Sequence, residues 1–413
     1  MIENDYSKMM PRMLSGEELM NTLKVIPQYS PSFKEMTTPE RLLRLSDIYK
    51  IYLPSAMSKE IYNRLYLATA MSLQKKGTRL SVIQQNSNFK GIQSNEYRGI
   101  IGGADSFTVI GTSGIGKSSA IDRAVNIICG GKIIEMEKPF TQIIPCLSVQ
   151  CPYDCSPKGM LLEILRMVDT ILDTRYYERS QRAGVTTDIL IGTVSQVAIN
   201  HIGLLIIDEI QNVSGHKSGN TLIAMLTQLI NQSGISICMV GTPDSIYFFE
   251  RSMQLSRRSM GLKYSTLPYD DYFSEFCTLV FGYQYVRKET EITDAEIEWL
   301  YEHSSGIISV VISLIHDAQE LAIFNGREIL DIQSLNEAFT QRLTMLHEYV
   351  APEKTVERTR MPKQKEIRAI HSTEPHTTPD YLSIMDIVKK SKDEGRDIIS
   401  ILREYLTVTE VAV

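Results

Sequence analysis

The segment IGTSGIGKSS, residues 110–119, constrains the fold of this chain more than any other stretch. It has the spacing Gly111, four residues, Gly116, Lys117 and Ser118, which is the pattern of a phosphate-binding loop. A β-prone run, FTVI, precedes it, and apolar residues at helical spacing follow it. An ordinary glycine and serine turn with a solvated lysine is the alternative. A loop between a strand and a helix favours phosphate binding, and thus a nucleotide-binding α/β domain.

Each residue type in this loop has a role in binding phosphates. Glycines let the backbone turn tightly and direct its N–H groups inward. Lys117 supplies positive charge for β- and γ-phosphates, and the Ser118 hydroxyl is placed to bind Mg²⁺. The predicted nucleotide-binding residues are Gly111, Thr112, Ser113, Gly114, Ile115, Gly116, Lys117, Ser118 and Ser119.

A pair of carboxylates follows a second apolar run in GLLIIDEIQ, residues 203–211. Asp208 is placed to hold Mg²⁺ through water, and Glu209 is placed to polarise the attacking water. Neighbours on a strand point to opposite faces, but both can face the ligand crevice where the chain turns at the carboxyl end of the strand. The alternative is a pair of surface charges. Four apolar residues before them indicate a buried central strand and favour the catalytic interpretation.

Two further segments extend the predicted site. In SICMVGTPDS, residues 236–245, the Thr242 hydroxyl could align the water near the γ-phosphate, while Thr242 could equally be the N-cap of a helix that begins at Pro243. In RSMQLSRRSMG, Arg257 and Arg258 could act on the nucleotide of a neighbouring subunit, which implies a homo-oligomer. The alternative for this pair is a solvated helix end whose charge complements the helix dipole.

Alternation of short β-type runs with helices predicts a parallel sheet with helices on both faces. The expected strands are 106–110, 142–150, 203–208, 235–241 and 263–267. We expect five regions: a helical N-terminal region at 1–84, a linker at 85–103, a nucleotide-binding core at 104–282, a small helical lid at 283–350, and a tether with amphipathic C-terminal helices at 351–413.

Composition limits the class of protein. The net charge of −6 excludes a globally basic nucleic-acid binder, so any DNA contact must be local. The sequence has 43% hydrophobic and 22% charged residues, as in globular proteins. We expect no membrane partner, because the most apolar helical stretch contains charged residues. The N-terminus lacks the order of a signal peptide, which favours a cytoplasmic protein.

The order of these parts resembles an AAA+ ATPase. LLIIDEIQNVSG, the later VGTPDS and QLSRR, CPYDCSPKGMLLEIL, and the lid segment from Ser304 to Phe339 look like the TnsC/TniB family, the transposition regulators of Tn7-like transposons, among them CRISPR-associated ones. The resemblance covers residues 38–347. It implies an AAA+ core with a helical lid, ATP and Mg²⁺ as cofactors, and a bacterial, DNA-associated protein.

The resemblance also implies partners. Such a protein forms rings or helical filaments on double-stranded DNA, links a target-selector protein to transposase subunits, and uses ATP hydrolysis to control disassembly. We expect the N-terminal region to contact the targeting factor and the C-terminal helices to contact the transposase. The DNA-facing candidates are Lys158, Arg175, Arg179 and Arg182.

One feature departs from the general AAA+ pattern: Ile307, Ile308, Ser309 and Val310 follow Gly306, where an arginine often contacts phosphate. Two other functions share the same core. One is a STAND-like signalling NTPase switch without DNA binding, and the other is a helicase-loader or origin-type AAA+ ATPase.

Overall fold

The computed structural model describes residues 5–76, 106–137, 140–181, 185–213, 219–246 and 261–342. The chain divides at residue 354, and residues 1–354 form the first compact unit. All described helices and strands belong to the first unit. The predicted linker and the predicted C-terminal helices lie outside the described residues.

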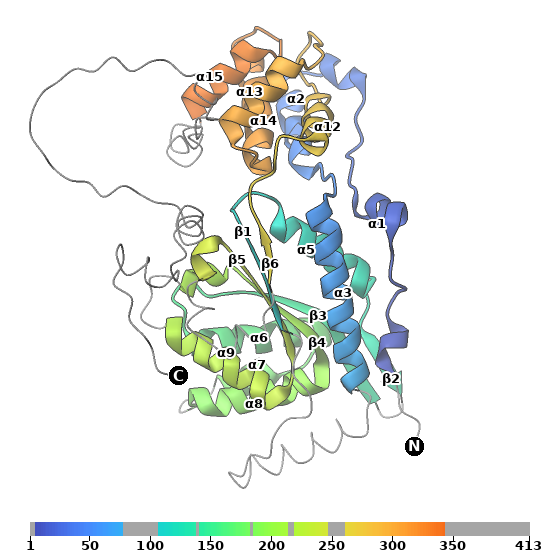
Figure 1. Cartoon of the computed structure of the whole chain (residues 1–413), viewed down its shortest axis with the longest axis vertical. Helices are drawn as coiled ribbons and strands as arrows, with labels where there is room; N and C mark the ends of the chain where they lie inside the picture. The colour runs from blue at the N-terminus through green and yellow to red at the C-terminus, as the bar shows by residue number, and fades with distance from the viewer. Residues whose placement is uncertain are drawn as a thin grey trace, which may run out of the picture. The chain divides into compact units, whose positions relative to one another are not determined.

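The described residues contain a six-stranded sheet in the order β2-β3-β4-β5-β1-β6, shown in Figure 1. Neighbouring strands are parallel except for β2, which runs antiparallel to β3. The predicted parallel sheet is therefore confirmed. The bounds are Phe107–Gly111 for β1, Ile134–Glu137 for β2, Phe140–Gln150 for β3, Ile202–Asp208 for β4, Ser236–Gly241 for β5 and Leu262–Tyr264 for β6.

Helices cover both faces of this sheet because its central strands are apolar on both sides. Along β4, Leu204 and Ile206 pack in a cluster with α3 and α5, whereas Leu205 and Ile207 pack in a cluster with α6, α8 and α9. Figure 1 shows these two helical layers. The bounds are Ala56–Lys76 for α3, Lys117–Cys129 for α5, Pro157–Leu172 for α6, Tyr176–Ser180 for α7, Thr187–His201 for α8 and Gly219–Ser233 for α9.

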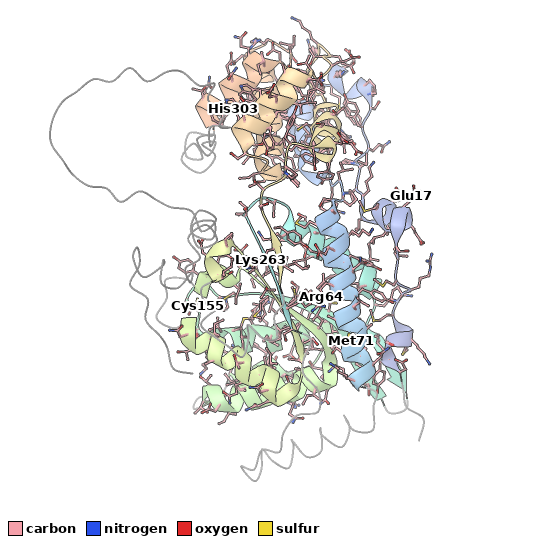
Figure 2. All side chains as sticks on the ribbon, in the orientation of Figure 1. Glu17, Arg64, Met71, Cys155, Lys263 and His303 are labelled. Atoms are coloured by element: carbon pink, nitrogen blue, oxygen red, sulfur yellow. The ribbon has the colours of Figure 1, made fainter. Side chains whose placement is uncertain are left out.

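The outer strands differ from the prediction. β2 was not expected, because its sequence IEME is short and has no continuous apolar run. β6 ends at Tyr264, earlier than the predicted strand, because the chain then leaves the sheet and the Leu267 N–H donates to the Gly306 carbonyl at 3.1 Å. The α3 helix contacts the start of β1 through Arg64, labelled in Figure 2, whose guanidinium lies 5.1 Å from the centre of the Phe107 ring.

The C-terminal part of the described chain is helical, as expected. The helices are α12 (Asp271–Phe281), α13 (Asp294–Ser304), α14 (Ile308–Phe324) and α15 (Ile332–Arg342). They share one apolar cluster with Leu45 and Ile48 of the N-terminal segment. No single described helix is long and apolar enough to cross a membrane; α13 and α14 meet that test only together, with a 119° bend between them.

Short elements complete the N-terminal segment and the strand ends. They are η1 (Tyr6–Met9), α1 (Gly16–Leu23), η2 (Pro31–Glu35), α2 (Thr38–Leu45), η3 (Ser46–Lys50), η4 (Ile210–Val213) and η5 (Pro243–Ser245). The α2 helix begins with a capping box between Thr37 and Glu40. Its buried Arg41 forms two 2.7 Å hydrogen bonds with the Glu328 carboxylate, which attaches the N-terminal segment to the helical bundle.

Candidate nucleotide-binding site

The phosphate loop connects β1 to α5, as its sequence predicts. Gly114 and Gly116 have φ angles of +82° and +93°, which favour glycine, and Gly116 is the N-cap of α5. Ile115 is buried and anchors the loop to the core. Residues 113–119 line a cavity of about 280 Å³, whose other walls come from distant parts of the chain.

Lys117 is the first residue of α5 and is buried. Its ammonium group donates hydrogen bonds to the carbonyls of Gly111 at 2.7 Å and Thr112 at 2.8 Å. Burial lowers the pKa of Lys117, and the nearby carboxylates of Asp208 and Glu209 act in the opposite direction. The Lys117 ammonium group therefore contacts the phosphate loop itself. The phosphates of a bound nucleotide could take the place of the two carbonyls as its hydrogen-bond acceptors.

Ser118 and Asp208 meet at the edge of this cavity. The Ser118 hydroxyl donates to Oδ2 of Asp208 at 2.8 Å, which brings the start of α5 to the end of β4. A hydroxyl and a carboxylate are the hard oxygen donors that suit Mg²⁺, an ion that keeps several waters and binds substrate phosphates. Among the described residues no group of three or more His, Cys, Asp or Glu side chains could hold a metal.

Glu209 lies beside Asp208, and its backbone explains how both carboxylates reach the cavity. Its φ angle is +59°, so the chain turns sharply at the end of β4. Its N–H donates to Oδ1 of Asp208 at 2.8 Å. Both residues line the cavity, as does Thr242 at the end of β5.

The sequence left two roles open for Thr242: a catalytic residue or the N-cap of a helix. It precedes Pro243 of η5, but its side chain makes no capping hydrogen bond. Its Oγ1 atom is buried and has no hydrogen-bond partner among the described residues. This hydroxyl is therefore available to a ligand in the cavity.

Two walls of the cavity were not identified from the sequence. One comes from residues 49–58, which include Tyr52, and the other from α12 and α14, which contribute Tyr272 and Ser309. The Ser309 N–H donates to the Gly114 carbonyl at 3.1 Å, so the first turn of α14 touches the phosphate loop directly. The lid thus contacts the phosphate loop through the backbone N–H of Ser309, in the turn where many AAA+ proteins have an arginine.

Comparison with known proteins agrees with this geometry. The family model described as AAA domain matches residues 100–248, which extend past the end of β5. The chain contains an AAA-type ATPase domain. The family match ends before the helical bundle that supplies one wall of the cavity. No curated protein matches the sequence.

Solved structures with partial similarity to the chain include two Aeropyrum pernix proteins and one domain of a replication initiation protein. The Aeropyrum pernix ORC1 protein in complex with DNA is 12% identical, with a TM-score of 0.40 over 63% of this chain and 64% of that one. The Aeropyrum pernix ORC2 protein, in ADPNP-ADP complexes, is 15% identical, with a TM-score of 0.39 over 63% and 66%. This chain thus spans just under two thirds of each of them. Domain III of the Thermotoga maritima replication initiation protein DnaA is 14% identical, with a TM-score of 0.33 over 67% and 94%.

Three of the four predicted DNA-facing residues are described, and they lie on or beside α6 and α7 of the AAA domain. Lys158, Arg175 and Arg179 are exposed. Lys158 lies in the first turn of α6, and Arg175 follows its last turn, so about 20 Å of helix separates them. Arg175 and Arg179 are four residues apart across α7 and share a side of it, whereas the Lys158 ammonium donates to the Val185 carbonyl at 3.3 Å. Arg182, Arg257 and Arg258 lie outside the described residues.

Proposed function

We propose that this chain is an ATP-dependent DNA-binding regulator that oligomerises on double-stranded DNA and links target-site selection to recruitment of transposase subunits. The ATPase part is supported by one observation: Lys117, the Ser118–Asp208 pair, Glu209 and Thr242 line a single cavity of the AAA domain. The transposition part is supported by the resemblance of the sequence to the TnsC/TniB family.

Five residues that line the cavity have a role in the proposed hydrolysis. Lys117 exchanges its loop carbonyls for the β- and γ-phosphates. Ser118 and Asp208 hold Mg²⁺, which supplies charge neutralisation at the phosphate oxygens. Glu209 orients the attacking water and takes up its proton, and the free Thr242 hydroxyl donates to the γ-phosphate.

Oligomerisation completes the site in this proposal. Arg257 or Arg258 of a neighbouring subunit reaches the γ-phosphate and stabilises the charge that develops there, an effect worth ~10³ to 10⁵ in rate where an arginine finger operates. Hydrolysis removes the γ-phosphate and with it this contact between subunits. ATP binding therefore favours the ring or filament, and hydrolysis favours disassembly.

DNA is held through its phosphates by basic side chains near α7, with Arg175 and Arg179 as the paired candidates. Phosphate contacts carry no sequence information, so binding is sensitive to salt and tolerant of sequence. Residues 1–84 contact the targeting factor, and residues 351–413 contact the transposase. A chain that ends at residue 350 should keep ATP and DNA binding and lose transposase recruitment.

The first experiment measures fluorescence anisotropy of a labelled, random-sequence DNA duplex with ATP, ADP or no nucleotide, together with ATP hydrolysis. Lys117→Ala should lose hydrolysis and ATP-dependent DNA binding. Lys132→Ala is the matched control, because Lys132 is exposed just beyond the other end of α5 and should behave as wild type.

A second pair of variants tests whether DNA binding depends on the positive charges near α7 or on the total charge of the chain. Arg175→Ala with Arg179→Ala should weaken DNA binding without changing hydrolysis in the absence of DNA. Lys59→Ala with Lys132→Ala removes the same charge from α3 and from just beyond α5, on the other face of the sheet, and should bind DNA normally. Hydrolysis without DNA binding in any nucleotide state would reject the DNA-bound regulator and favour a protein-only switch.

A further inference from the structure

The side-chain amide of Gln211 connects the ends of two strands in the candidate site. Gln211 lies in η4 and lines the cavity. Its Oε1 atom accepts a hydrogen bond from the Thr242 N–H at 3.3 Å, and its Nε2 donates to Oε2 of Glu209. One neutral side chain thus touches both residues that we assign to the γ-phosphate and the attacking water.

The backbone around Gln211 is built to bring these groups together. The turn at Glu209, with its φ of +59°, is closed by a 3.1 Å hydrogen bond from the Asn212 N–H to the Glu209 carbonyl. A non-glycine residue in this conformation is strained, and the surrounding contacts must offset the strain. The turn places both Glu209 and Gln211 on the cavity side. A strand that continued straight past Asp208 would not bring them there together.

Gly241 allows β5 to approach this turn closely. A Cβ atom at this position would lie 3.1 Å from Oε1 of Gln211 and 2.7 Å from Cγ2 of Ile210. The backbone N–H of Thr242 therefore reaches the amide, while its hydroxyl stays without a partner among the described residues.

We propose that Gln211 is a positioning residue that couples Thr242 to Glu209, so that γ-phosphate contact at Thr242 sets the orientation of the Glu209 carboxylate. This role rests on the proposed ATP hydrolysis. The amide of Gln211 cannot flip by 180°, because a flip would place its NH₂ group against the Thr242 N–H, which is also a donor. Its NH₂ group is therefore always presented to Glu209. A shift of the β5 end moves the amide, and the amide moves the carboxylate.

Two substitutions of Gln211, each by a side chain of similar size, distinguish its hydrogen bond with Thr242 from its hydrogen bond with Glu209. Gln211→Met loses both of them, whereas Gln211→Glu can still accept from the Thr242 N–H but has no donor for Glu209. We expect both variants to lower kcat for ATP roughly 10- to 100-fold, the loss typical of an orienting partner. The Kd for ATP, measured with a fluorescent analogue on the full chain, should stay within about threefold, since Gln211 is assigned no contact with the ground-state nucleotide.

Gln232→Met is the matched control, because Gln232 is also half-buried and accepts from the Ser195 hydroxyl far from the cavity. It should keep the wild-type kcat. The thermal midpoints of all variants report folding, and an unfolded Gln211→Met leaves Gln211→Glu to carry the test.

The decisive comparison is made in a Glu209→Gln background. If Gln211 acts through Glu209, Gln211→Met has no further effect on the residual rate there. An equal loss in both backgrounds, or a wild-type kcat for Gln211→Met beside an inactive Glu209→Gln, would overturn the role of Gln211 alone. A wild-type chain that hydrolyses no ATP, or a fully active Glu209→Gln, would overturn the proposed function together with this role.

Discussion

The Ser118 hydroxyl, in the first turn of α5, donates a 2.8 Å hydrogen bond to the Asp208 carboxylate at the end of β4. The bond shows that the phosphate loop and the second apolar strand converge, although 90 residues separate their polar side chains. Both oxygens can turn toward Mg²⁺ at little cost, since each already lies at the cavity edge.

Ser118→Ala should remove most of the Mg²⁺-dependent part of nucleotide binding. A ligand at 100 times its Kd stabilises a protein by about 2.7 kcal/mol, and a tenfold loss of affinity removes about 1.3 kcal/mol of this. The thermal midpoint with ATP and Mg²⁺ is compared with the midpoint with ATP and EDTA. Ser233→Ala, which removes a hydroxyl bonded to a carbonyl within α9, should keep the full difference. An unchanged Mg²⁺ effect in Ser118→Ala would contradict the assigned metal site.

Gly114→Ala should destabilise the chain more than Gly116→Ala. Both glycines have positive φ angles, so both substitutions carry a backbone cost of about 1–2 kcal/mol. At Gly116 nothing lies within 4 Å of the added Cβ, but at Gly114 the Cβ would lie 2.2 Å from Oγ of Ser309 and 2.8 Å from Cγ2 of Ile307. Overpacking of this kind costs a further ~1–3 kcal/mol. Urea unfolding measures the difference between the two variants.

The same lid contact gives a control for this comparison. Ser309→Gly removes the atom nearest to the added Cβ and should recover part of the stability lost in Gly114→Ala, without helping Gly116→Ala. Equal stabilities of the two alanine variants would mean that the first turn of α14 does not rest on the phosphate loop in solution.

The sequence predicted which edge of the sheet carries the candidate site, because parallel strands bring their carboxyl ends together. Asp208 ends one buried strand and Thr242 follows the next, so the sequence predicts that both lie near Lys117. The walls formed by residues 49–58 and by α14 were not predicted, since they come from segments far away in the chain and hydrophobic spacing gives no information on which helix faces the loop.

Two polar contacts could not be predicted from the sequence, for a different reason. Gln211 is an ordinary polar residue in a loop, and only the turn at Glu209 directs it toward Thr242. The buried pairing of Arg41 could not be predicted, because arginine is rarely fully buried and Glu328 lies 287 residues away. Its burial follows from the packing of α2 against the helical bundle, which is a tertiary property.

Glu328→Gln should destabilise the chain by about 3 kcal/mol at pH 7, because it leaves the Arg41 guanidinium buried without a counter-charge. Arg41 keeps the Tyr285 carbonyl as an acceptor, at 2.9 Å, and the new amide oxygen at position 328 offers one more neutral acceptor. Glu163→Gln is the matched control, since it breaks an exposed pair with Arg166 that is worth at most about 1 kcal/mol. Urea unfolding at pH 7 checks both values, and equal losses would contradict a buried attachment of α2.

The same pair predicts a pH dependence whose sign follows from the pKa of Glu328. Hydrogen bonds from Arg41 lower this pKa below its ordinary value, and burial opposes them more weakly. A carboxyl group with a lowered pKa stabilises the folded state fully above its unfolded pKa, about 4.3, and loses this contribution as the pH falls through its folded pKa. The stability difference between wild type and Glu328→Gln should therefore be constant from pH 7 to about 5 and shrink at lower pH. Glutamine does not titrate, so the difference isolates Glu328 from the other carboxylates, provided that urea unfolding is measured at each pH on both chains. A difference that stays constant down to about pH 3 would show that Arg41 and Glu328 do not form the ion pair in solution.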